Sequence, residues 1–234
     1  MNQQPEPHLR LPADLRSVWA EINLDHIAHN IREIRRKVPQ SAQIMAIVKA
    51  NGYGHGARQV GRTALANGAA MLGVAIVEEV IHLRKGGITA PIHILGMPPA
   101  GQAVLVVEND ASCAVSSWPV AEALSQAAQR LGKTARVHIK VDTGMGRLWL
   151  LPADAPEFAE KLVRLPGLKL EGLFTHFATA DEADKSYTVS QFQAFRKVQA
   201  ALEARGIQIP LAHVANSAAI LDLPETYAGA VRPG

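Results

Sequence analysis

Short apolar runs alternate with longer amphipathic stretches from about residue 43 onward. Eight runs have the length of strands: IMAIVKA (44–50), MLGVAIV (71–77), PIHILG (91–96), ASCAVSS (111–117), RVHIKVD (136–142), LKLEGLFTHF (168–177), LAHVANS (211–217) and GAVRPG (229–234). Runs such as IMAIV are apolar at every position, as expected of strands buried on both faces. The stretches between them have helical periodicity, and VEEVIHLRKGG ends on a glycine typical of a helix C-cap. This alternation predicts an α/β fold, a TIM-type (β/α)8 barrel.

The segment before the first run has a different character. Residues 1–15 are polar and proline-rich, which predicts a disordered leader. Within residues 16–42, WAEINLDHI is interpreted as a short strand, followed by apolar residues at helical spacing with Asp25 near the helix start. We therefore expect a strand and a helix that pack on the barrel.

The same alternation is also typical of an open doubly wound sheet, because periodicity alone does not count strands reliably. The sequence stops at Gly234, directly after the last apolar run and without an eighth helix. This ending predicts that residues 43–234 form a barrel cut off after its eighth strand, and that the sequence is a fragment.

Composition narrows the class of protein. Hydrophobic residues make up 48% of the 234 positions, enough for a large buried core. The formal charge of +3 comes from basic residues scattered among acidic ones, so no tract indicates a nucleic-acid partner. No run approaches the roughly 18 residues of a membrane helix. With a single cysteine, Cys113, and no apolar signal region, we expect a cytoplasmic protein.

Polar residues follow several of the predicted strands. Lys49 follows IMAIV, His176 ends LEGLFTH, and Arg232 ends GAV. The carboxyl ends of barrel strands are where such enzymes build their sites. A desolvated lysine amine has a lowered pKa and becomes nucleophilic, so Lys49 is a candidate for covalent catalysis. A lysine that simply extends into solvent is the alternative interpretation.

Several motifs resemble those of one enzyme family. They are WAEINLDHIAHNIR, AIVKANGYGHG (46–56), KVDTGMGRL (140–148), GLFTHFATADE (172–182) and the terminal VRPG. In this order they are similar to the N-terminal barrel domain of alanine racemases, from which Gly52 and Trp149 are small departures. The resemblance implies a barrel that binds pyridoxal 5'-phosphate, with the C-terminal β-domain absent. It also implies a racemase that interconverts L- and D-alanine for peptidoglycan, and a homodimer in the complete protein.

The resemblance assigns roles around the cofactor. Lys49 would hold the cofactor covalently and serve as one of two catalytic bases. Tyr53, one helical turn further on, would contact the phosphate. Arg147 would hydrogen-bond the phenolic oxygen and lie near the substrate carboxylate, a task that suits a planar fork of donors. Lys140 matches a lysine that is often carbamylated in the family, whereas an ordinary ion pair is the alternative.

The remaining assignments concern the phosphate and the pyridine ring. Asn216, Ser217 and the backbone N–H of Gly234 would bind the phosphate, although Asn and Ser also cap helices without a ligand. His176 would lie against the pyridine ring. No metal site is expected.

Arg232 is the residue most informative about the reaction. The resemblance places it facing the pyridine nitrogen. With a pKa above about 12 it would not protonate that nitrogen, which favours racemisation over transamination. His213 would support Arg232 from behind.

Racemisation needs a base on each face of the reacting carbon. In the family, the second base is a tyrosine from the C-terminal domain of the partner subunit, which this sequence lacks, so we expect the chain alone to be poorly active. Two alternatives remain: a single-domain homeostasis protein that carries pyridoxal phosphate without racemase turnover, and a Schiff-base aldolase without a cofactor.

Overall fold

A computed structural model describes residues 18–147 and 150–234 of the chain. Within these residues, parallel strands close into a barrel in chain order: β1 (Gln43–Ile47), β2 (Met71–Val74), β3 (Ile92–Ile94), β4 (Ala111–Val115), β5 (Ala135–Lys140), β6 (Leu168–Phe174), β7 (Leu211–Asn216) and β8 (Ala230–Arg232). Pairing of β1 with β8, for example Gln43 with Ala230, closes the sheet. The predicted barrel is confirmed, and the open doubly wound sheet is excluded.

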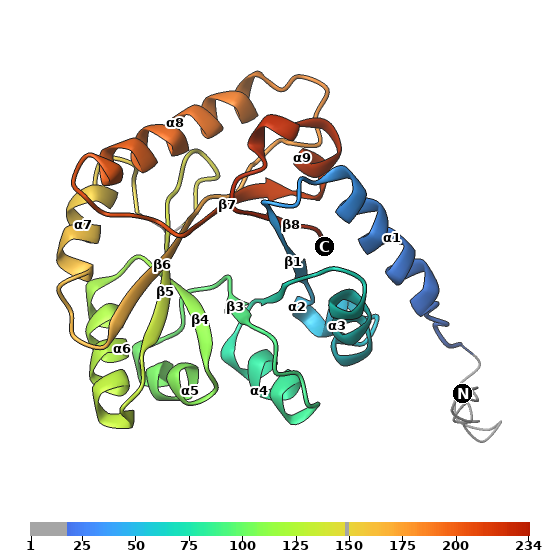
Figure 1. The fold of residues 1–234 in the computed structure, drawn as a ribbon, viewed down its shortest axis with the longest axis horizontal. Helices are drawn as coiled ribbons and strands as arrows, with labels where there is room; N and C mark the ends of the chain where they lie inside the picture. The colour runs from blue at the N-terminus through green and yellow to red at the C-terminus, as the bar shows by residue number, and fades with distance from the viewer. Residues whose placement is uncertain (1–17, 148–149) are drawn as a thin grey trace.

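Helices surround the strands (Figure 1). The described residues form α1 (Leu24–Lys37), α2 (Lys49–Tyr53), α3 (Ala57–Ala66), α4 (Val77–Lys85), α5 (Ala103–Glu108), α6 (Trp118–Leu131), α7 (Ala155–Leu162), α8 (Ser186–Glu203) and α9 (Ser217–Asp222), with 3-10 turns η1 (Ala100–Gln102) and η2 (Pro224–Thr226). As predicted, α4 ends at a glycine, Gly86. None of these helices is long and apolar enough to cross a membrane.

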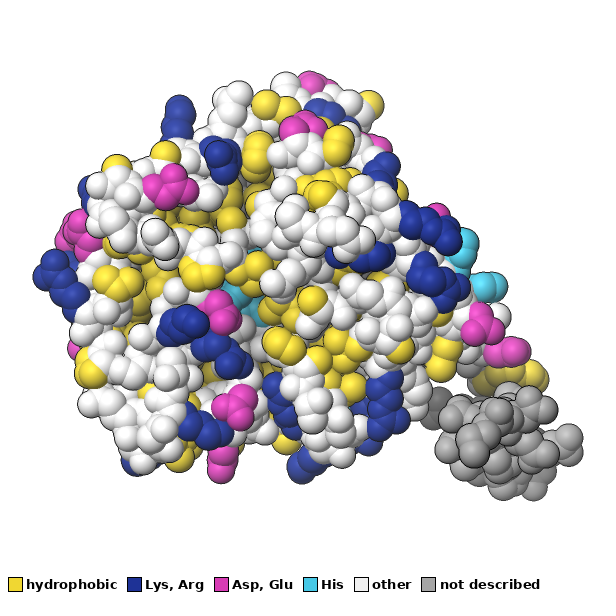
Figure 2. All heavy atoms as spheres, in the orientation of Figure 1, with side chains coloured by type: hydrophobic (Ala, Val, Ile, Leu, Met, Phe, Trp, Pro, Cys, Tyr) yellow, Lys and Arg dark blue, Asp and Glu magenta, His cyan; other side chains and the backbone are white. Residues whose placement is uncertain are grey.

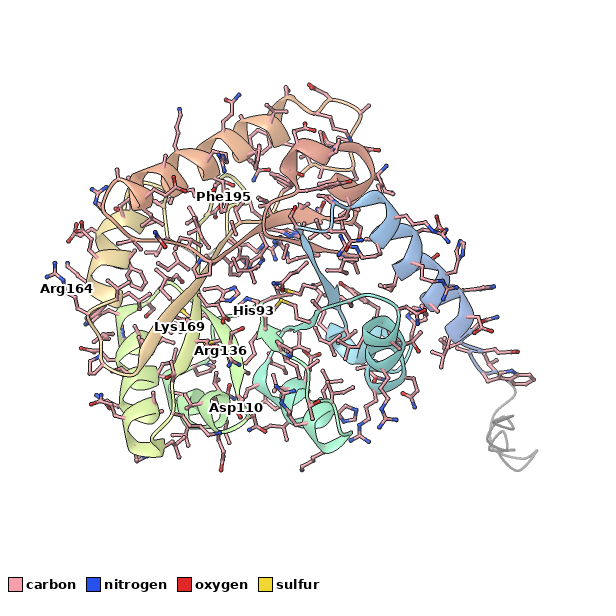
Figure 3. All side chains as sticks on the ribbon, viewed as in Figure 1. His93, Asp110, Arg136, Arg164, Lys169 and Phe195 are labelled. Atoms are coloured by element: carbon pink, nitrogen blue, oxygen red, sulfur yellow. The ribbon has the colours of Figure 1, made fainter. Side chains whose placement is uncertain are left out.

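The main hydrophobic core lies between the barrel and its helices. Every residue of β2 and β4 is buried, because each strand has the barrel interior on one face and helices on the other. Leu83 of α4, Leu124 of α6 and Phe195 of α8 are fully buried, and Phe195 points from its helix towards the strands (Figure 3). Burying a side chain of this size contributes about 1.5–3 kcal/mol.

The barrel interior contains polar rings as well as apolar side chains. His93, His138 and His213 are each 0% exposed, and His93 lies at the centre of the barrel (Figure 3). The rings of His93 and His138 stack with centroids 4.0 Å apart, and those of Phe174 and His213 stack at 4.6 Å. Three strands thus each place an imidazole in the interior, where a polar atom without a hydrogen-bond partner is costly.

The strand expected before α1 is not formed. Residues 18–23 run without regular structure, and the side chain of Trp19 is 78% exposed. A strand needs a neighbour for its backbone groups, and no described strand pairs with this segment. The Asn23 side chain instead accepts a hydrogen bond from the N–H of Asp25 at 2.8 Å and caps α1. The predicted disordered leader, residues 1–15, lies outside the described residues.

Candidate active site

A cavity of about 150 Å³ lies at the carboxyl ends of the strands. It is lined by Ile47, Lys49, Tyr53, Leu95, Lys140, Arg147, Phe174, His176, Asn216, Ser217, Arg232 and Gly234. These include all the site residues predicted from sequence except His213, which lies beneath the cavity against Arg232. Among the described residues of the lining, several are basic and none is acidic. This donor set fits the phosphate and phenolic oxygens of pyridoxal phosphate.

The turn that follows Lys49 winds in the left-handed direction. Residues 50–53 have φ between 50° and 64°, although only one of them is glycine. A left-handed conformation costs roughly 1–2 kcal/mol for each residue with a Cβ. The Asn51 side chain helps to hold the turn by accepting a hydrogen bond from the N–H of Ala57 at 3.0 Å. The turn brings the ring centroid of Tyr53 to 5.8 Å from the Lys49 Nζ. The expected spacing of one turn is therefore correct, but the hand is opposite.

Lys140, at the end of β5, is buried. Its Nζ lies 5.2 Å from the centroid of the Phe174 ring. Burial, followed by the positive charges of Arg147 and Arg232, lowers the pKa of Lys140 to about 7. Roughly half of this amine is therefore neutral at pH 7, the form that reacts with electrophiles.

A loop held by Asp142 carries Arg147 to the rim of the cavity. The Asp142 carboxylate accepts hydrogen bonds from the N–H groups of Gly144 at 2.9 Å and Gly146 at 3.1 Å. The Tyr187 hydroxyl donates to the carbonyl oxygen of Gly144 at 2.7 Å. These contacts fix the loop, while Arg147 itself is exposed.

Arg232, at the end of β8, is 4% exposed. Its Nη2 donates to the carbonyl oxygens of Thr175 at 2.8 Å and Val214 at 3.0 Å, and it lies 3.4 Å from His176 Nδ1. Its Nη1 lies 3.0 Å from His213 Nδ1. Burial lowers the pKa of Arg232 to about 9, below the value expected from sequence, yet the guanidinium is still protonated at neutral pH.

The side chain of His176 is neutral at pH 7 because its pKa is strongly lowered. Burial, followed by the positive charge of Arg232, lowers the pKa of His176 to about 3. A neutral imidazole at the cavity wall can lie against an aromatic ring without adding a further positive charge.

Ser217 and Gly234 meet at the wall of the cavity. The Ser217 hydroxyl lies 3.0 Å from the carbonyl oxygen of Gly234, and the N–H of Gly234 lies 3.1 Å from Ser217 Oγ. The Asn216 side chain accepts a hydrogen bond from the N–H of Ala219 at 3.1 Å and so caps α9, the alternative left open above. A larger apolar cavity of about 480 Å³ adjoins the first and shares Ile47, Tyr53, Ser217 and Gly234 with it.

Sequence reasoning missed the polar residues beneath the cavity. His138 Nδ1 lies 2.9 Å from His213 Nε2, and His138 Nε2 lies 3.3 Å from Glu171 Oε2. The available signal was a histidine between two apolar residues of a predicted strand, as in the IHI of β3 and the VHI of β5. Such a position leaves a buried polar group that needs a partner.

Comparison with known proteins identifies relatives of the whole described domain. Residues 22–234 match the family model described as alanine racemase, N-terminal domain. The alanine racemase of Clostridium perfringens strain SM101 is 50% identical over 223 residues, covering 94% of this chain and 57% of that protein. That of Methanococcus maripaludis is 46% identical, covering 93% and 58%. The chain thus spans less than two thirds of these curated relatives.

Solved structures give the same result. The alanine racemase of Clostridium difficile 630 superposes with a TM-score of 0.89 at 38% identity, covering 92% of this chain and 57% of that one. The enzyme from D-cycloserine-producing Streptomyces lavendulae gives 0.85 at 38% identity, covering 90% and 56%.

Proposed function

The chain belongs to the alanine racemase family, to whose N-terminal domain it corresponds, and on that premise we propose that it binds pyridoxal phosphate through Lys49. We propose further that it forms one part of the site at which the complete protein interconverts L- and D-alanine. The observation that carries the proposal is the convergence of Lys49, Arg147, Arg232 and the phosphate-side residues on one cavity.

The lining divides into a phosphate side and a ring side. Tyr53, Ser217 and the N–H of Gly234 would bind the phosphate, since hydroxyl and backbone N–H donors suit its oxygens. His176 would lie against the ring, and Arg147 would donate to the phenolic oxygen and hold the substrate carboxylate. When bound, pyridoxal phosphate supplies an electron-withdrawing ring that makes the Cα proton of an amino acid more acidic.

The protein residues move and direct the proton. The Lys49 amine takes up or returns the Cα proton on the face that leads to D-alanine. Arg232 would face the pyridine nitrogen as a donor that keeps its own proton at neutral pH, so return of the proton to Cα is favoured. His213 holds the Arg232 guanidinium from behind.

The second base must come from outside this sequence. Of its three tyrosines, Tyr187 and Tyr227 each donate their hydroxyl to a backbone carbonyl oxygen, and Tyr53 is assigned to the phosphate. We therefore propose that the chain alone exchanges a proton on one face and inverts alanine poorly. The homodimer, the cytoplasmic location and the supply of D-alanine for peptidoglycan stay predictions.

The cofactor site is tested by spectroscopy on the 234-residue chain. Pyridoxal phosphate is added, the visible spectrum is recorded, and borohydride reduction is followed by peptide mapping. We expect a visible band and a reduced adduct on Lys49, both lost in Lys49→Ala. Lys169→Ala, at the amino end of β6, is the matched control and should keep both. An adduct on other lysines of a chain folded by circular dichroism would overturn the assignment.

Proton exchange separates the racemase from the homeostasis protein. Incubation of L- and D-alanine with the loaded chain in deuterium oxide, followed by proton NMR, measures exchange at Cα. Because Lys49 serves the D side, we expect D-alanine to exchange faster than L-alanine, with little inversion. Binding of the cofactor without exchange of either enantiomer would favour the homeostasis protein.

A further inference from the structure

A line of hydrogen bonds runs from the cavity through the barrel interior. Arg232 Nη1 lies 3.0 Å from His213 Nδ1, His213 Nε2 lies 2.9 Å from His138 Nδ1, and His138 Nε2 lies 3.3 Å from Glu171 Oε2. Both histidines are 0% exposed, whereas the Glu171 side chain is 26% exposed. The line therefore joins a buried cation at the cavity to a carboxylate that reaches solvent.

The chemistry of the two ends fixes the direction of every bond. A guanidinium has only donors, so Arg232 donates and His213 Nδ1 accepts. Burial lowers the pKa of both histidines, so each is neutral and carries one N–H. The proton of His213 is then on Nε2 and is donated to His138 Nδ1. His138 must carry its own proton on Nε2, which it donates to the Glu171 carboxylate, a group that only accepts.

Arg232 otherwise has only neutral partners. Within the described residues, no carboxylate oxygen lies within 4.0 Å of its guanidinium, and besides His213 it contacts two backbone carbonyl oxygens and the His176 ring. An uncompensated buried charge is costly. The aligned imidazoles turn their acceptor sides towards Arg232 and their N–H sides towards Glu171, so they carry part of the carboxylate's negative potential to the cation.

We propose that Glu171 is a positioning residue for Arg232, acting through His138 and His213 as a remote counter-charge that fixes both tautomers and the orientation of the guanidinium. This proposal rests on the proposed function in one respect, namely that Arg232 faces the pyridine nitrogen of the cofactor. On the solvent side, Glu171 Oε2 lies 3.9 Å from Arg136 Nε. Figure 2 shows acidic and basic side chains side by side next to histidine atoms near the centre of one face.

A metal ion is the competing interpretation of the same histidines. His93, His138 and His213 have ring nitrogens within 4.8 Å of one another, and His93 Nε2 has no hydrogen-bond partner. Burial first, and then neighbouring groups that include Arg232 and Lys140, lower the pKa of His93. A divalent cation there would face the same two positive charges. It would also need one ring nitrogen of His138, and both are already hydrogen-bonded, Nδ1 to His213 and Nε2 to Glu171. The geometry therefore favours the hydrogen-bonded line.

The test reads the tautomers directly, on the 234-residue chain without cofactor. Nitrogen chemical shifts of 15N-labelled histidine distinguish Nδ1–H from Nε2–H forms, and we expect Nε2–H for both His138 and His213. In Glu171→Gln the amide still accepts but the charge is lost, so the His213 nitrogens should shift although they do not touch position 171. Glu160→Gln, which removes a carboxylate paired with Arg205 at 3.1 Å, is the matched control and should leave them unchanged.

Several outcomes would overturn the proposal. The first is a proton on Nδ1 of His213. The second is a change of nitrogen chemical shifts in Glu171→Gln that affects His138 but not His213. The third is a joint shift of the His93, His138 and His213 signals when one equivalent of Zn²⁺ is added. The tautomers of the unmodified chain decide the matter even if Glu171→Gln does not fold. Glu171→Asp, which keeps the charge, should restore the His213 shifts.

A second measurement connects the line to the cavity. In Glu171→Gln we expect roughly tenfold weaker retention of pyridoxal phosphate, comparable to the loss when a residue that orients a metal ligand from behind is removed. Glu171→Asp should recover most of it. Retention unchanged in Glu171→Gln would contradict a positioning role. If the unmodified chain shows the expected tautomers but takes up no cofactor, the proposed function fails while the hydrogen-bonded line stands.

Discussion

The buried histidines make the free energy of unfolding depend on pH. Burial lowers the pKa of His93 and His213 well below 6.5, whereas in the unfolded chain each titrates near 6.5. Below that pH the unfolded state binds more protons, so stability that is fully present above pH 6.5 is lost as the pH falls. A histidine that stays neutral in the fold gives a loss of about 1.4 kcal/mol at pH 5.5, so this pair gives about 3 kcal/mol between pH 8 and pH 5.5. His176, whose pKa is about 3, and Lys140, whose pKa is about 7, each add a loss of about 1.4 kcal/mol over the same range.

Urea unfolding followed by circular dichroism at constant ionic strength, at several values between pH 8 and pH 5.5, measures this loss. His93→Gln removes one of these groups, so the loss of stability between pH 8 and pH 5.5 should become smaller by about 1.4 kcal/mol. His29→Gln on the exposed face of α1 is the control and should keep the full dependence. A free energy of unfolding that is flat over this range, or a slope unchanged in His93→Gln, would refute the reasoning.

Three further predictions concern single positions. A Cβ at Gly172 would lie 2.4 Å from His138 Nδ1, so Gly172→Ala should lower the free energy of unfolding by about 1–3 kcal/mol in urea; an unchanged midpoint would contradict this packing. Ala50→Gly relieves a left-handed residue and should raise stability by about 1 kcal/mol, and a lower melting temperature would argue against strain in the turn. Because the pKa of Lys140 is about 7, its amine is largely neutral at pH 8; native mass spectrometry in bicarbonate should show one added carbon dioxide that Lys140→Ala lacks.

Much of the barrel follows from local pattern, because strands buried on both faces are apolar at every position. Closure of the barrel does not follow from local pattern. The pairing of Gln43 with Ala230 joins residues far apart in the sequence, and such a pairing has no effect on the periodicity of either segment. The segment that begins at Trp19 was interpreted as a strand, which is not formed. A sequence pattern describes one segment and does not show whether a neighbouring strand is available to pair with it.

The cavity could be predicted for a related reason. Carboxyl ends of parallel strands meet at one rim, so polar residues that follow such strands converge there. The line of hydrogen bonds from Arg232 to Glu171 could not be predicted from the sequence. His138 and Glu171 lie in different strands, and only the register of β5 and β6 brings them together. The left-handed turn was missed because residue spacing is the same for either hand.

Closure of the barrel by β1 and β8 has a consequence for the order of folding during synthesis. The partner of Gln43 is Ala230, so β1 emerges from the ribosome early and keeps one open edge until nearly all of the described strands have followed. An apolar strand with an unpaired edge is a template for pairing with another chain. A nascent chain of this domain is therefore most prone to aggregate in the interval before β8 emerges, and chaperone binding in that interval would protect β1.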